Sequence, residues 1–234
     1  MCFVLLSVSA TAQQSKPPVK LPVWKISFDL DLGSEGEITV MKENQEQTIM
    51  KEVARSLSGA SDGESPLICY VNPGYIRVEQ RGIGGGITIA DKKDTVSFLI
   101  DSTSRTATRF PAATPNLQTQ MNGDSVVLIS SDDFKMELQN DTMTIAGQAC
   151  RKALFVNPES PSAVITVWYA PGLPRLYWQK YSYLKQIPGC ALFIGTVTKG
   201  MKVGIKAVKI EKETQTLSFF LPPPGYTVLE GSLY

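Results

Sequence analysis

Apolar and polar side chains alternate along most of the chain, and the alternation is first clear near the N-terminus. Apolar residues take every second position from Trp24 to Leu32, and polar residues fill the positions between them. Period two is typical of a strand with one buried face. Similar patterns, separated by turns rich in Asn, Asp and Gly, recur at 37–41, 75–80, 87–91, 96–101, 105–110, 126–130, 134–139, 142–147, 151–156, 163–170, 192–198 and 202–212.

Two stretches depart from period two. At 45–58, the residues Ile49, Met50, Val53 and Leu57 fall on one helical face, which predicts a helix. A second short helix or helical turn is expected within 173–188, where prolines delimit an aromatic segment. Short strands at such spacing predict an antiparallel sheet of about ten strands. We therefore expect a mainly β (α+β) fold, a curved antiparallel sheet or incomplete β-barrel with about two helices packed on its concave side.

The N-terminus resembles the end of a secretory signal peptide. An apolar run ends in Ala10-Thr11-Ala12, the small-x-small pattern that precedes signal peptidase cleavage. We expect a signal peptide at 1–12, a flexible proline-containing linker at 13–22 and a single β-rich domain at 23–234. The alternatives are a short buried strand in place of the signal peptide, and two β domains divided near 115–125. The apolar run is too short to span a bilayer, and export would place the chain in the periplasm or at the outer membrane.

Composition excludes several kinds of chemistry. The chain has no histidine, which removes the imidazole base and the commonest transition-metal ligand. Lys and Arg number 23 against 22 Asp and Glu, so no basic patch for nucleic acid is indicated. Asp29-Leu-Asp31-Leu-Gly33 does not match a calcium loop, which needs glycine at the sixth position. Residues 82–86 are glycine-rich, but a strand follows them, so they predict a hairpin turn and not a phosphate loop. We expect no metal and no cofactor.

Three cysteines follow the expected cleavage site, at Cys69, Cys150 and Cys190. They can form at most one internal disulfide, or all three can be buried thiols. Cys150 precedes two basic residues that could lower its pKa, but no general base accompanies it. A structural role is therefore the favoured interpretation for Cys150.

An aromatic cluster near the C-terminal third is the candidate binding site. Its two interpretations are a core packed under a helix and the wall of an apolar cavity in a half-open barrel. The core interpretation is favoured, and a partly filled barrel would satisfy both. The residues predicted to bind a ligand are Trp168, Leu173, Tyr177, Trp178, Tyr181 and Leu184.

The same third of the chain resembles a known family through a series of short blocks. They are TIAGQACRKA (144–153), VWYAPGLP (167–174), YLKQIPGCALFIG (183–195), AVKIEK (207–212) and LPPPGY (221–226). They are similar to the uncharacterised secreted bacterial families that include the one named GLPGLI. The Pro-Gly of the GLPGLI motif is present here at 188–189, but Cys190 stands in place of the leucine that follows it in the motif. The resemblance implies a fold like that of the outer-membrane lipoprotein carriers LolA and LolB, and it implies no activity for any residue.

These observations predict a non-catalytic envelope protein that binds or carries an apolar ligand, such as a lipid or acyl chain. This prediction rests mainly on analogy of fold. The alternatives are a structural or interaction protein of the cell envelope with no small ligand, and a carboxylate-based hydrolase. We expect no enzyme activity, no nucleic-acid partner and no transmembrane span, with envelope proteins as further partners.

Overall fold

The structure is a computed structural model that describes residues 17–34, 65–82, 85–111, 117–122, 125–130, 133–158, 160–198 and 201–231. The predicted signal peptide at 1–12, strand at 37–41 and helix at 45–58 lie outside these residues. The strands are β1 Lys20–Ser34, β2 Leu67–Val71, β3 Tyr75–Gln80, β4 Gly86–Asp91, β5 Val96–Asp101, β6 Thr106–Pro111, β7 Leu117–Asn122, β8 Ser125–Ser130, β9 Lys135–Ile145, β10 Gln148–Asn157, β11 Ser160–Ala170, β12 Cys190–Thr198, β13 Met201–Thr216 and β14 Thr227–Glu230.

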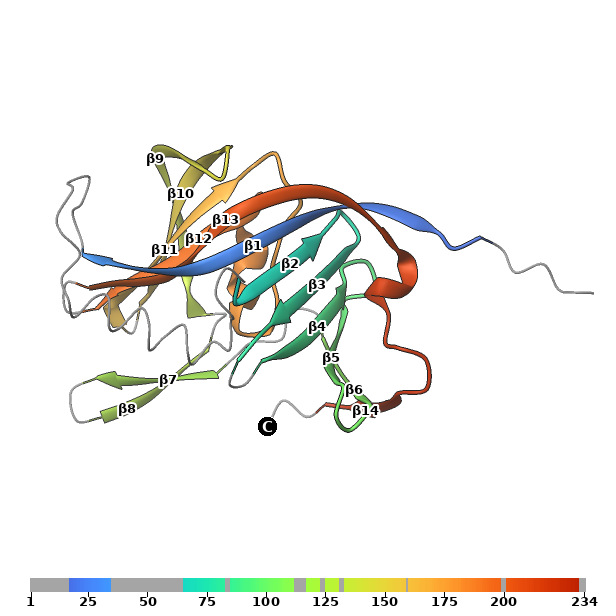
Figure 1. The fold of residues 1–234 in the computed structure, drawn as a ribbon. Helices are drawn as coiled ribbons and strands as arrows, with labels where there is room; N and C mark the ends of the chain where they lie inside the picture. The colour runs from blue at the N-terminus through green and yellow to red at the C-terminus, as the bar shows by residue number, and fades with distance from the viewer. Residues whose placement is uncertain are drawn as a thin grey trace, which may run out of the picture.

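Twelve of these strands form one open, curved sheet, which confirms the predicted mainly β fold (Figure 1). Their order is β14-β6-β5-β4-β3-β2-β1-β13-β12-β11-β10-β9, and β7 and β8 form a separate hairpin. The sheet thus consists of two meanders, β1–β6 and β9–β13, which meet where β1 pairs with β13. Neighbouring strands are antiparallel except that β14 runs parallel to β6.

The longest strands, β1 and β13, hold the two meanders together. Their pairing runs from Lys20 opposite Thr216 to Ser34 opposite Met201, with a bulge between Ser27 and Phe28. The strand therefore starts inside the segment 13–22 that was predicted to be a flexible linker, because β13 is long enough to pair with it. A bulge increases local twist and bends a strand. It lies midway along β1, where the two meanders curve toward each other (Figure 1).

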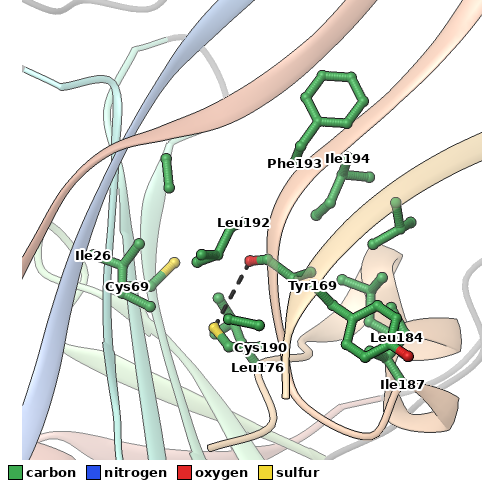
Figure 2. Close-up of a cluster of buried hydrophobic side chains, with 14 of the residues drawn as sticks. Ile26, Cys69, Tyr169, Leu176, Leu184, Ile187, Cys190, Leu192, Phe193 and Ile194 are labelled. Atoms are coloured by element: carbon green, nitrogen blue, oxygen red, sulfur yellow. Dashed lines mark hydrogen bonds between the residues drawn. The ribbon is translucent and has the colours of Figure 1, made fainter. Parts of the chain in front are cut away.

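The concave side of the curved sheet encloses the first core. Side chains from both meanders meet there, with Ile26 and Cys69 from β1 and β2 facing Cys190 and Leu192 of β12 (Figure 2). The chain between β11 and β12, residues 171–189, packs its side chains into the same core and is called the β11–β12 connection below. Its members Leu176, Leu184 and Ile187 are fully buried.

A second core lies on the opposite face of the β1–β6 meander. It contains Val23, Tyr70, Ile89, Ile100 and Ala107, and it is completed by Phe220. Residues 217–226, called the C-terminal strap, cover this face. The strap begins with the 3₁₀ helix η3 at Leu217–Phe220 and continues through three prolines to β14. The β1–β6 meander is thus covered on both faces.

The strap is attached to the sheet by one arginine. The Arg77 guanidinium lies 4.2 Å from the ring centre of Phe219, and its Nη1 donates a hydrogen bond to the Phe219 carbonyl at 2.9 Å. Glu79 accepts from Arg77 Nε at 2.7 Å and holds the guanidinium in place. The ring of Phe219 also meets Tyr70 edge to face at 4.9 Å.

The segment 173–188 contains a helical turn but no regular α-helix. The segment forms the 3₁₀ helix η2, Gln179–Gln186, and Tyr181 inside it has non-helical backbone angles. Backbone bonds span three residues, from the Tyr181 amide to the Trp178 carbonyl and from the Ile187 amide to the Leu184 carbonyl. Aromatic and leucine side chains of this short segment are buried in several directions, which one regular α-helical face could not achieve. The expected concave layer of α-helices is therefore absent from the described residues.

Three strands of the structure were not predicted, and two predicted strands form one continuous strand. Leu67–Val71 lacks period two because it is buried on both faces, and the polar Leu117–Asn122 was assigned to a connecting stretch. Thr227–Glu230 is an exposed edge strand. The predicted strands 134–139 and 142–147 form the single strand β9, which continues through Asn140 and Asp141 with a register shift opposite β10.

Candidate functional site

Two hollows border the β11–β12 connection. One is an apolar cleft between η2 and the central strands, and the other is a pocket with basic side chains that is lined by both ends of the connection. Tyr181 and Tyr183 contribute to the cleft, whereas Leu173, Tyr177 and Lys185 contribute to the pocket. The connection thus takes part in both.

The apolar cleft has a volume of about 420 Å³. Strand pairing explains how its walls come together. Ile194 lies opposite Ile205, and Thr196 lies opposite both Val203 and Ile165, so these side chains share the concave face. The cleft is lined by Leu30, Ile165, Tyr181, Tyr183, Ile194, Gly195, Thr196, Val203, Gly204 and Ile205.

Two facing glycines shape the sheet at the cleft. Gly195 and Gly204 are directly paired, and the ring of Phe193 packs over them on the other side of the sheet. A Cβ on Gly195 would lie 2.5 Å from Cζ of Phe193 and 3.0 Å from the Val203 carbonyl oxygen. Any larger residue there would displace the ring or the strand, so the pair of glycines allows Phe193 to close the outer face behind the cleft.

The polar atoms of the cleft are already engaged or neutral. The Thr196 hydroxyl donates to the Val164 carbonyl at 3.0 Å. Burial raises the pKa of both Tyr181 and Tyr183, so each phenol stays protonated at neutral pH. The Tyr183 ring meets Phe155 at 4.9 Å and Phe134 at 5.6 Å, which fixes its position. The site is therefore a rigid, largely apolar surface.

The structure separates the six residues predicted to form the site. Tyr181 lines the cleft, while Leu173 and Tyr177 line the basic pocket. Trp178 and Leu184 are buried in the first core, with the Trp178 ring 4.6 Å from that of Tyr181.

Trp168 faces away from the cleft. In the strand register it lies opposite Lys152 on one side and Phe193 on the other, and it packs, partly buried, against residues of the first core. The Lys152 ammonium is 5.9 Å from its ring centre. The aliphatic residues of β1, β11, β12 and β13 that do line the cleft were not among the predicted residues. Their period-two spacing indicates a buried face, but not which strands become neighbours.

The three cysteines are free and buried. Figure 2 shows Cys69 and Cys190 in the first core, where the Cys190 thiol points to the carbonyl of Ala191 at 3.7 Å. Burial raises the pKa of Cys69 and Cys190 well above the ordinary value, and it also raises the pKa of Cys150. Reactive cysteines need the opposite shift, so these environments disfavour a thiolate nucleophile.

No group of three or more Cys, Asp or Glu side chains within the described ranges is arranged to hold a metal ion. In the same part of the chain, no helix is long and apolar enough to cross a membrane.

Comparison with known proteins gives a likeness of fold. No protein-family model and no curated protein sequence matches the chain. A structure of PNGF-II in C2 crystals is similar with a TM-score of 0.52 and 15% identity, over 91% of this chain and 31% of that one. A P21 crystal form of PNGF-II gives 0.46 and 16%, over 90% of this chain and 32% of that one. An uncharacterised conserved protein of Thermus thermophilus gives 0.44 and 10%, over 89% of this chain and 90% of that one.

The likeness to PNGF-II in C2 crystals shows that the fold of this chain occurs elsewhere, and at this identity it shows the fold alone. The chain spans about a third of the length of that protein.

Proposed function

We propose that this protein is a non-catalytic, exported protein that binds an apolar ligand, such as a lipid or a single acyl chain, in the cleft beneath η2. The observation that carries the proposal is the cleft itself. Its volume of about 420 Å³ falls within the range of small-molecule sites, and aliphatic and tyrosine side chains dominate its lining. An acyl chain placed there would lose contact with water along its length, which is the main source of affinity for such ligands.

The lining supports binding over catalysis. A general acid or base needs a pKa near the working pH. The titratable groups of the cleft are Tyr181 and Tyr183, whose pKa values burial raises further from neutrality. Among the described residues that line the cleft there is no carboxylate of the kind that a hydrolase of the two-acid type would need.

The cellular location is part of the same proposal. The apolar segment ending in Ala10-Thr11-Ala12 supports export, and the sequence blocks between 144 and 226 support kinship with the secreted GLPGLI-like families. An open, curved sheet with an apolar concave side is also compatible with a lipoprotein-carrier-like role in the periplasm or at the outer membrane.

Two valines on β13 offer a matched test. Val203 lines the cleft and is 41% exposed, whereas Val208 is 55% exposed on the same strand and does not line it. A carboxylate at Val203 would have to be desolvated by a bound acyl chain, at a cost of more than about 1.4 kcal/mol. Val203→Glu should therefore weaken the binding of a fluorescent fatty acid by about tenfold or more, and Val208→Glu should change it by less than about twofold.

Fluorescence titration of the wild type, Val203→Glu and Val208→Glu with the fatty acid tests whether the cleft is the binding site. Thermal melts check that both variants are folded. Equal weakening by both substitutions would indicate charge repulsion of the fatty acid and not a site in the cleft. A wild-type protein that never binds the probe would overturn the proposal and favour a structural or interaction protein of the envelope.

A further inference from the structure

The second hollow, called the basic pocket here, has a different chemistry from the cleft. Its volume is about 570 Å³, and it lies where the β2–β3 and β4–β5 turns meet the β11–β12 connection. Three of its lining residues are cationic, and none of those described is acidic. The lining consists of Pro73, Lys92, Leu173, Pro174, Arg175, Tyr177, Lys185, Pro188 and Gly189.

Lys92 is held rigidly in the pocket wall. Its ammonium donates to the Asn72 carbonyl at 2.7 Å, and its backbone amide donates to the Gly74 carbonyl at 2.8 Å. The Asn72 side chain in turn accepts the backbone amides of Gly74 and Tyr75. An ammonium has three donors, so the bond to Asn72 leaves Lys92 able to donate to a ligand.

Partial burial disfavours the charged form of Lys92. Burial, with a smaller contribution from the Arg175 charge, lowers the pKa of Lys92 to about 8, although the Cys190 thiol opposes this shift. Lys92 therefore still carries its proton at pH 7, next to another cation. Its sequence neighbour Asp91 does not line the pocket, and its carboxylate accepts the amides of Lys93 and Asp94 within its own turn.

A bound anion would stabilise the charged form of Lys92. Three cations around one hollow suit a doubly charged group better than a single carboxylate, and Arg presents paired donors to phosphate oxygens. The flat faces of Pro174, Pro188 and Tyr177 are available to the organic part of a ligand. We propose that the pocket formed by Lys92, Arg175 and Lys185 binds the phosphate monoester group of a small organic ligand or of a lipid headgroup.

This inference does not rest on the proposed function, because the cleft and the pocket share no lining residue. Its test uses the full-length protein and calorimetric titration with glycerol 3-phosphate at pH 7 and about 50 mM salt, where charge interactions are weakly screened. Sedimentation with phosphatidylcholine vesicles, with and without phosphatidic acid, examines the lipid source of the same group.

The matched variants lie side by side in one turn. Lys92→Gln and the exposed Lys93→Gln remove the same charge, but only the first residue lines the pocket. Arg175→Gln, at an exposed position, guards against a folding defect in Lys92→Gln. We expect Lys92→Gln and Arg175→Gln each to weaken binding by about tenfold or more, and Lys93→Gln by less than about twofold.

Binding of glycerol 3-phosphate would identify a soluble ligand, and binding of phosphatidic acid vesicles alone would identify a lipid headgroup. Either result supports a phosphate site in the basic pocket if Lys92→Gln and Arg175→Gln weaken binding and Lys93→Gln does not. Saturable binding of neither probe up to about 10 mM, or equal weakening by Lys93→Gln, would overturn it. Because fatty-acid binding is measured separately, failure here would leave the proposal for the cleft standing.

Discussion

The two faces of the β1–β6 meander are buried by different kinds of cover. On the concave face, the opposing meander and the β11–β12 connection enclose the first core, and Cys69, Cys150 and Cys190 lie in it. On the other face, the C-terminal strap covers a smaller core through Phe219, Phe220 and Tyr226, which adjoin solvent to different extents. Both described hollows border the connection, and neither is lined by the strap.

The difference in cover accounts for the place of the two described hollows beside the connection. The strap is an extended chain that follows the sheet closely, since Arg77 attaches it at Phe219 and β14 continues beside β6. The connection, in contrast, is a short irregular segment set between two curving meanders. It packs aromatic rings into the first core, and it borders both described hollows.

The largest expected effect comes from removing the ring that anchors the connection. Tyr183 is 1% exposed and contacts Phe134 and Phe155, so Tyr183→Ala should lower the free energy of unfolding by about 3–5 kcal/mol. The matched change in the strap, Tyr226→Ala, removes a half-buried ring from the second core and should cost about 1 kcal/mol. Urea unfolding followed by fluorescence gives both values.

Equal costs for the two tyrosine substitutions would contradict the distinction between a fully enclosed core and a partly exposed one. A variant Tyr183→Phe controls for the hydroxyl, because it keeps the ring contacts and should be much less destabilising than Tyr183→Ala.

A smaller effect concerns pH. Burial raises the pKa of Cys190 above its ordinary value of 9.0, so the folded protein keeps the thiol proton that the unfolded chain releases. Above pH 9 each such thiol therefore lowers stability by about 1.4 kcal/mol per pH unit, whereas the lowered pKa of Lys92 acts in the opposite direction over the same range. Cys69 contributes in the same direction.

In unfolding measurements from pH 8 to 10, Cys190→Ala should remove the contribution of one thiol proton, so its stability should change less unfavourably with pH than that of the wild type. The comparison uses slopes, because the substitution also changes packing. An unchanged slope in Cys190→Ala would mean that the concave core admits water near this thiol.

Much of the β structure could be predicted because period two is a local pattern. The hairpin of β12 and β13 and the strands β3 to β6 follow directly from alternation and turn residues. The strand Leu67–Val71 was not predicted, because burial on both faces removes the alternation of apolar and polar residues. In the segment 173–188, the helical spacing of Tyr177, Tyr181 and Leu184 favours one shared face. The structure instead places Tyr177 at the basic pocket and Tyr181 at the cleft.

The candidate sites were less predictable, for a physical reason. The cleft depends on β1 pairing with β13, two strands far apart in the chain, and nothing local specifies that pairing. The basic pocket likewise unites Lys92 from a hairpin turn with Arg175 from the connection. The segment with the aromatic cluster supplies side chains to both hollows, and its role in ligand binding stays a prediction.

The central claim is that the cleft beneath η2 holds an apolar ligand, and native mass spectrometry of the protein purified from its own cells without detergent tests it most directly. The account predicts a population heavier than the bare polypeptide by the mass of an acyl-chain compound. The same preparation of Val203→Glu should lose that population, while Val208→Glu should keep it. Wild-type protein found only at the bare polypeptide mass, or a ligand retained equally by Val203→Glu, would contradict the account.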